Sequence, residues 1–222
     1  MVSCSQRLGR VLPQVTASGI HIMVAEQPIR LDELTSGERT RCHQFATAQR
    51  RDVWLRGRAA LKMLLHHLGE HLDTTKLSFP HPRLSLTHSG TYAVAAGVAP
   101  DHFFGGIGVD LEIQQALHPE AARFFLTEEE RRWFTRLRSN LKARELLRLW
   151  TVKEAVLKAD VNNEGRMLVD YRLAVPGARN GVASVADTRG FRSFLYTSIG
   201  LQQGFFSIAV RQDKEDAPWS TS

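Results

Sequence analysis

Hydrophobic residues recur along the chain at helical spacing in one long stretch of the first half. Residues 49–68 carry apolar side chains every three or four positions, and Gly69 ends the pattern, so a helix is predicted there. The expected buried side of this helix comprises Val53, Leu61, Leu64, Leu65 and Leu68. The expected exposed side is basic and comprises Arg50, Arg51, Arg56, Arg58 and Lys62. Shorter helical pieces are expected at residues 31–34 and 39–45.

The same spacing predicts a second long helix over residues 142–160. Its apolar stripe consists of Leu146, Leu149, Trp150 and Leu157. Upstream, Thr127 and Glu130 have the three-residue spacing of a capping box, which predicts a helix that reaches about Leu137.

The remaining apolar stretches are short and predict strands. They are residues 18–25, 92–98, 107–113, 168–175, 182–185, 191–196 and 205–211. We expect residues 1–17 to be weakly tied and residues 214–222 to form a polar tail. Helices and strands in this order predict the α+β class.

A short internal repeat relates the two long helices. Residues 54–62 align without gaps on residues 150–158, and Trp, Ala, Leu and Lys coincide in four of nine positions. In the second copy Glu154 replaces Arg58. We therefore predict two similar α/β halves related by a pseudo-two-fold, residues 1–104 and 105–222, each with its helix on its own antiparallel sheet and with the loop at residues 100–106 joining them.

Three acidic side chains stand out against this framework. Residues 106–113 alternate strictly, which puts Asp110 and Glu112 on one face of a strand, beside glycines that let a ligand approach the backbone. Glu154 lies one helical turn from Lys158. Each pattern alone is typical of a solvated surface, but three carboxylates together supply the hard oxygen ligands that Mg²⁺ prefers. The set does not suit zinc.

Composition narrows the class of protein. The chain has 222 residues, 43% of them hydrophobic, which is enough for a sizeable core, and its formal charge of +6 favours polyanionic partners. Cys4 and Cys42 are expected to be free thiols. The chain contains no apolar run that could span a membrane, no signal-peptide pattern, no Walker A loop and no dinucleotide fingerprint, so we expect a cytoplasmic protein.

Two motifs in this order resemble the signature of the phosphopantetheinyl transferase superfamily. Residues 108–112 read GVDLE, similar to the family pattern G-[VI]-D-[IVL]-E, and residues 150–158 read WTVKEAVLK, similar to W-[ST]-x-K-E-[AS]-x-x-K. Residues 123–130 resemble the family's R-F-F segment, and residues 87–89 resemble its [ST]-H-S motif. Chain length points to the larger, surfactin-synthetase type, which is pseudo-dimeric.

The resemblance implies a function and a set of site residues. It implies Mg²⁺-dependent transfer of 4′-phosphopantetheine from coenzyme A to a serine of an apo acyl, polyketide or peptidyl carrier protein, by a monomer. The implied metal ligands are Asp110, Glu112 and Glu154, with Glu154 and Lys158 catalytic. The implied contacts to coenzyme A are Arg41, Arg50, Arg51, Thr87, His88, Lys153 and Lys158. Thr87 would meet the pyrophosphate and His88 the 3′-phosphate, whereas Val53 stands where the alignment places a family arginine.

Two other functions remain open from the residues alone. A non-enzymatic nucleic-acid-binding protein would explain the basic residues between Arg39 and Lys62, but it lacks interleaved aromatic side chains and leaves the carboxylates unexplained. An Mg²⁺-dependent phosphate-ester or nucleotide hydrolase would use the same carboxylates as metal ligands, but it would not explain the [ST]-H-S motif. We expect neither nucleic acid nor a membrane to be a partner.

Overall fold

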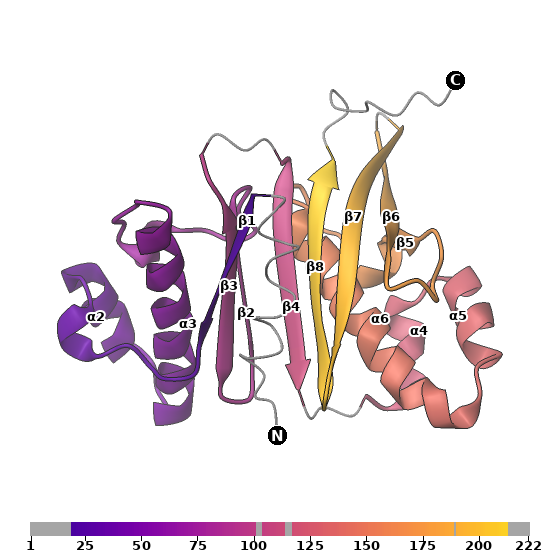
Figure 1. The fold of residues 1–222 in the computed structure, drawn as a ribbon, viewed down its shortest axis with the longest axis horizontal. Coiled ribbons are helices and arrows are strands. Elements are labelled where there is room, and N and C mark those ends of the chain that lie inside the picture. The colour runs from indigo at the N-terminus through magenta and orange to yellow at the C-terminus, as the bar shows by residue number, and fades with distance from the viewer. Residues whose placement is uncertain (1–18, 101–103, 114–116, 189, 213–222) are drawn as a thin grey trace.

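The computed structural model describes residues 19–100, 104–113, 117–188 and 190–212. Within these ranges two antiparallel sheets lie between two long helices, as Figure 1 shows. The predicted α+β class is confirmed. No helix in these ranges is long and apolar enough to cross a membrane.

The first sheet uses the first part of the chain and has the strand order β1-β3-β2. Its strands are β1 (Ile20–Ala25), β2 (Leu84–Ser89) and β3 (Tyr92–Val98). Two helices and two 3-10 turns separate β1 from β2: η1 (Leu31–Glu33), α2 (Ser36–His43), α3 (Ala48–His67) and η2 (Thr74–Lys76). The helix predicted at residues 49–68 is confirmed as α3. The short helix predicted at residues 39–45 begins earlier, because Thr35 and Glu38 form a capping box at the start of α2.

The second sheet has the order β4-β8-β7-β6-β5. Its strands are β4 (Gly106–Ile113), β5 (Arg172–Leu173), β6 (Asn180–Asp187), β7 (Gly190–Leu201) and β8 (Gly204–Gln212). Between β4 and β5 lie η3 (Pro119–Ala121), α4 (Ala122–Phe125), α5 (Glu128–Thr135), α6 (Ser139–Ala159) and η4 (Leu168–Asp170). The long strand predicted at residues 168–175 is therefore wrong: it contains a 3-10 turn and the two residues of β5. The capping box of Thr127 and Glu130 is confirmed.

Three apolar layers hold these elements together. One lies between α3 and the first sheet, one between the two sheets, and one between the second sheet and α6. The predicted apolar stripe of α6 is confirmed, because Leu146 and Leu149 are buried and Trp150 and Leu157 pack against the same cluster. The alternation in β4 is confirmed too, because Ile107, Val109 and Leu111 pack into the layer between the sheets.

The two sheets repeat one arrangement. The order β1-β3-β2 in the first sheet corresponds to β4-β8-β7 in the second. A capped short helix and then a long helix lie between β1 and β2 and again between β4 and β5. The sheets use residues 20–98 and 106–212, and residues 101–103 of the predicted joining loop lie outside the described ranges. Residues 1–17 and 214–222, with Cys4, also lie outside them, whereas Cys42 is a buried free thiol.

Candidate active site

The acidic face of β4 lies against α6 because two glycines remove the side chains between them. A Cβ atom on Gly108 would clash with the carbonyl oxygen of Ala155, and one on Gly106 with that of Ala159. We expected these glycines to admit a ligand, but the backbone of α6 fills the space instead. The close approach brings Asp110 and Glu112, farther along the strand, next to the part of α6 that carries Glu154 and Lys158.

Asp110 is the most buried residue of this group. Its residue is 4% exposed, and its Oδ1 accepts hydrogen bonds from Lys158 Nζ at 2.7 Å and from Thr87 Oγ1 at 3.1 Å. The other oxygen, Oδ2, is buried without a hydrogen-bond partner. An unpaired buried carboxylate oxygen is costly, so a hydrogen-bond donor or a cation at this position would stabilise it.

The two glutamates lie in an environment that disfavours their charge. Burial raises the pKa of Glu112, and the negative charge of Asp110 adds to this, while hydrogen bonds from Ser89 and Trp150 and the charge of Lys158 oppose it. Burial also raises the pKa of Glu154, where Lys158 opposes and Asp110 adds to the shift. The three predicted metal ligands are therefore electrostatic neighbours that share one lysine.

These residues fit a divalent cation in chemistry but are not arranged as a cage. No group of three His, Cys, Asp or Glu side chains in the described part of the chain converges closely enough to hold a metal ion. Lys158 Nζ donates a hydrogen bond to Asp110 Oδ1 and another to the Val109 carbonyl oxygen, the latter at 3.3 Å. Asp110 Oδ2 has no hydrogen-bond partner, so this single ammonium does not satisfy the whole carboxylate. Mg²⁺ would supply further positive charge there.

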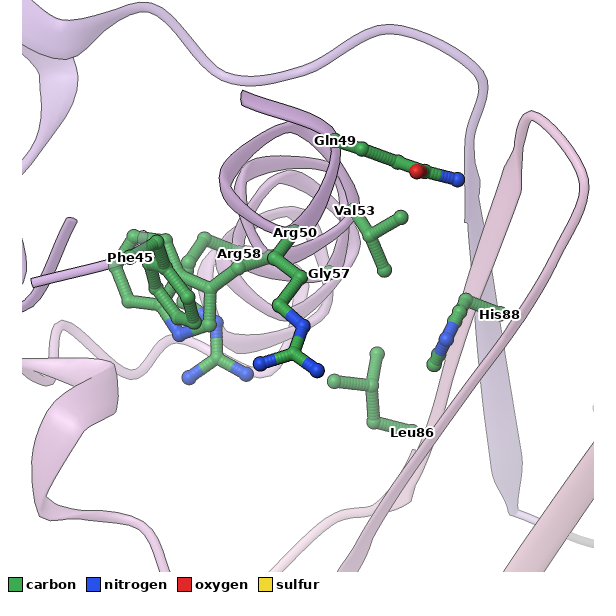
Figure 2. Close-up of a pocket in the computed structure, with 9 residues that line it drawn as sticks. Phe45, Gln49, Arg50, Val53, Gly57, Arg58, Leu86 and His88 are labelled. Atoms are coloured by element: carbon green, nitrogen blue, oxygen red, sulfur yellow. The ribbon is translucent and has the colours of Figure 1, made fainter. Parts of the chain in front are cut away.

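A cavity of about 530 Å³ lies beside this group, between α3 and β2. Figure 2 shows Arg50, Arg58 and Phe45 on one side of it and Leu86 and His88 on the other. The lining residues are Phe45, Gln49, Arg50, Val53, Trp54, Gly57, Arg58, Leu86 and His88. The cavity therefore combines apolar walls with cationic groups, which suits a ligand with a ring system and anionic substituents.

His88 connects the cavity to the carboxylates. Partial burial lowers its pKa, Lys158 and Arg56 lower it further, and Asp110 acts in the opposite direction. The charges of Lys158 and Asp110 thus both act on His88, although it projects from a different sheet.

The predicted arginines divide among three positions. Arg50 lines the cavity. Arg41 stacks over the Phe45 ring, with its guanidinium carbon 5.4 Å from the ring centroid, and donates a hydrogen bond to Gln44. Arg51 is exposed and does not line the cavity.

The structure does not bring Lys153 or the Thr87 hydroxyl to the cavity. Lys153 is fully buried, 2.6 Å from Glu130 Oε2, and also donates to the carbonyl oxygen of Tyr171. It is a core residue, because the face of α6 that carries it packs against α5 and the strands beyond. The Thr87 hydroxyl is buried against Asp110 and the Leu111 N–H, so the side chain is already used on the opposite side of β2.

Two features of the site were missed in the sequence. Arg58, expected on the exposed side of α3, is 9% exposed, stacks on Trp54 at 5.2 Å, and keeps a buried Nε without a hydrogen-bond partner. The four-residue spacing of Trp54 and Arg58 was an available signal. The hydroxyls of Ser85 and Ser89 alternate with apolar residues in β2, and that alternation could have indicated a second, polar contact face.

Comparison with known proteins gives three findings. Residues 106–198 match the family model described as the 4′-phosphopantetheinyl transferase superfamily. No curated protein matches the chain. Among solved structures, the chain is similar to the holo-[acyl-carrier-protein] synthase (AcpS) of Thermotoga maritima, with 19% identity and a TM-score of 0.42. That match covers 50% of this chain and 66% of the other, slightly less than two thirds of its length.

The matched residues contain β4, α5, α6 and most of β7. Asp110, Glu112, Glu154 and Lys158 all fall within them. The family-model match thus links residues 106–198, the part of the chain that carries the acidic group, to the 4′-phosphopantetheinyl transferase superfamily.

Proposed function

We propose that this protein transfers 4′-phosphopantetheine from coenzyme A to a serine of an apo carrier protein, in an Mg²⁺-dependent reaction. The observation that carries the proposal is that Asp110, Glu112, Glu154 and Lys158 are electrostatic neighbours close to a cavity with cationic and apolar walls. The family match adds the reaction class.

Each group has a proposed part in the reaction. The serine oxygen attacks the phosphorus of the phosphopantetheine group, the bond from that phosphorus to the bridging oxygen breaks, and 3′,5′-ADP leaves. Glu154, or a water that it orients, takes the serine proton, and its raised pKa brings it nearer to the range of an effective general base. Lys158 supplies positive charge to the leaving phosphate.

Asp110, Glu112 and Glu154 would hold the Mg²⁺. When bound, the ion neutralises charge on the pyrophosphate. The 3′-phosphate and adenosine part of coenzyme A would lie in the cavity of about 530 Å³, with Arg50 and His88 as phosphate contacts. Arg41, behind Phe45, and the exposed Arg51 are secondary candidates.

The repeated arrangement of the two halves favours the larger, pseudo-dimeric type of transferase, with both halves in one chain acting as a monomer in the cytoplasm. The formal charge of +6 suits the polyanionic donor and an acidic carrier surface. The carrier would be of the acyl, polyketide or peptidyl type.

Coenzyme A consumption separates this function from its rivals. A transferase consumes coenzyme A only when an apo carrier is present, a hydrolase consumes it without a carrier, and a nucleic-acid-binding protein does not consume it. Consumption that is independent of the carrier would favour the hydrolase.

A magnesium titration tests the ligand role of Glu112. Glu112→Gln keeps the shape and removes one charge, so half-maximal activity should require at least about tenfold more Mg²⁺. Glu129→Gln, at an exposed position in α5, is the matched control. An unchanged titration curve for Glu112→Gln would exclude that role.

A further inference from the structure

The edges of the two sheets meet through a row of hydroxyl groups. Three hydroxyl residues alternate along β2, and each accepts a hydrogen bond from a backbone N–H of β4, 24 positions later in the chain. The pairs are Ser85 with Val109 at 3.0 Å, Thr87 with Leu111 at 3.3 Å, and Ser89 with Ile113 at 2.9 Å. β4 is the edge strand of its sheet and pairs on its other side with β8. The hydroxyls therefore satisfy an edge that would otherwise need another strand.

Two of the three hydroxyls also reach the acidic side chains. Thr87 Oγ1 donates to Asp110 Oδ1 at 3.1 Å, and Ser89 Oγ donates to Glu112 Oε2 at 3.3 Å. A hydroxyl has one donor and two acceptor positions, so it can bind the N–H and the carboxylate together. The third hydroxyl, on Ser85, has no acid within its reach in the register, since the residue before Val109 is Gly108.

The opposite face of the same strand lines the cavity. Leu86 and His88 alternate with the hydroxyl residues and lie on the cavity wall, as Figure 2 shows. The strand β2 is consequently a shared wall, with the cavity on one face and the acidic pair held on the other. We therefore expect substitutions on the hydroxyl face to leave the side chains of the cavity face in place.

We infer that Thr87 and Ser89 are positioning residues that fix the orientation of Asp110 and Glu112, whereas Ser85 only joins the two strands. The consequence for metal binding rests on the proposed function. The consequence for side-chain orientation does not, because it follows from the hydrogen bonds alone. This assigns Thr87 to the acidic pair and not to direct contact with the donor.

Three variants separate positioning from strand joining. Thr87→Val keeps the branched shape and removes the hydroxyl, and Ser89→Ala removes the other acid-bound hydroxyl. Ser85→Ala removes an equivalent strand contact without touching an acid, and is the matched control. Thr87→Ser restores the hydroxyl and should restore the wild-type result. If Thr87→Val does not fold, Ser89→Ala and Ser85→Ala still form a complete comparison.

The first readout is the side-chain rotamer of the acids, from NMR scalar couplings in the full chain without metal. The preferred rotamer of Asp110 should become less populated in Thr87→Val, where only Lys158 still binds its Oδ1. That of Glu112 should become less populated in Ser89→Ala, where Trp150 remains a partner. Both acids should keep their rotamers in Ser85→Ala, although the Val109 amide there should exchange with solvent faster. The second readout is calorimetric Mg²⁺ affinity, which should fall about 10- to 100-fold in Thr87→Val and Ser89→Ala and stay unchanged in Ser85→Ala.

Unchanged rotamers in Thr87→Val and Ser89→Ala would overturn the inference. So would equal changes in all three variants, since the hydroxyls would then have only a structural role. If the wild-type chain binds no Mg²⁺, the metal part of the proposed function fails, and the rotamers still decide whether Thr87 and Ser89 position the acids.

Discussion

The two halves of this chain share one arrangement of helix and sheet, but the contact between helix and sheet is apolar in the first half and includes an acidic group in the second. In the first half, α3 packs on its sheet through an apolar layer that includes Ala25, Ala93 and Ala95. In the second half β4, the counterpart of β1, presents glycines and then Asp110 and Glu112 to α6. The scaffold is thus compatible with either an apolar contact or an acidic group at the same place, and the residues of the first strand and the long helix decide which one forms.

The position of the internal repeat at which Glu154 replaces Arg58 shows a similar difference between the halves. Arg58 of α3 is buried on Trp54 at the cavity, and burial lowers its pKa, against the charge of Glu38. Glu154 of α6 is half-buried beside Lys158, and burial raises its pKa. One position on the scaffold therefore gives a cationic cavity wall in the first half and a candidate base in the second.

The largest expected effect comes from removing that base. Glu154→Gln should lower the transfer rate about 10⁴-fold, because it removes both a general base and a metal ligand. Coenzyme A binding should stay measurable, since the cavity side chains are unchanged. Single-turnover transfer assays and calorimetry with coenzyme A check the two parts. A residual rate within tenfold of wild type would mean that the second half does not depend on this acid.

An ion pair in each half offers a second contrast, in the free energy of unfolding. Lys153 pairs with Glu130 at 2.6 Å and both side chains are 0% exposed, whereas Lys62 pairs with Glu38 at 2.9 Å and is 24% exposed. Lys153→Met should lower the free energy of unfolding by about 3–5 kcal/mol, because it leaves a buried carboxylate unpaired. Lys62→Met should lower it by about 1.5 kcal/mol. Urea unfolding of both variants gives the comparison, and equal losses would contradict the assigned difference in burial.

A smaller effect is expected at His88, which lines the cavity from β2. His88→Ala should raise KM for coenzyme A about tenfold, because it removes one charge-assisted hydrogen bond to the 3′-phosphate. The change for dephospho-coenzyme A, which lacks the 3′-phosphate, should be smaller. Steady-state kinetics with both donors provide the test, and an equal change in both KM values would separate His88 from that phosphate.

The smallest expected effect concerns the acid side of the stability profile. Burial alone would raise the pKa of Glu38, but hydrogen bonds from Thr74, Thr35 and Lys62 together lower it. A carboxyl with a lowered folded pKa stabilises the protein above its unfolded pKa of about 4.5, and the contribution is lost as pH falls below that value. Glu38→Gln should therefore lower stability at pH 7 and flatten the decline below pH 4.5. Unfolding measured from pH 3 to 7 checks this, and an equally steep decline in the variant would assign it to other carboxyls.

Much of this contrast was predictable from the sequence. The alternation in β4 indicated which residues share the acidic face, and the helical spacing indicated α3 and α6, because each pattern depends only on near neighbours in the chain. The fate of Lys153 and Arg58 was not predictable in this way. Each of these two side chains is buried against a partner from another element. Lys153 pairs with Glu130, and Arg58 donates to the Thr74 carbonyl oxygen.

The contact between the sheets was also beyond the local patterns. The hydroxyls of Ser85, Thr87 and Ser89 acquire their role only because β2 lies beside the free edge of β4. The glycines of β4 show the reverse case. Their need for a close approach was predictable, but the approaching group, α6, was not.

We propose that the second half performs phosphopantetheine transfer with a donor bound in the cavity between α3 and β2. Intact-protein mass spectrometry of an apo carrier after incubation with this chain, coenzyme A and Mg²⁺ tests it most directly. We expect the mass gain of one phosphopantetheine group on a single carrier serine, and none with Glu154→Gln. Folded wild-type protein that adds no mass to acyl, polyketide or peptidyl carriers would contradict the claim.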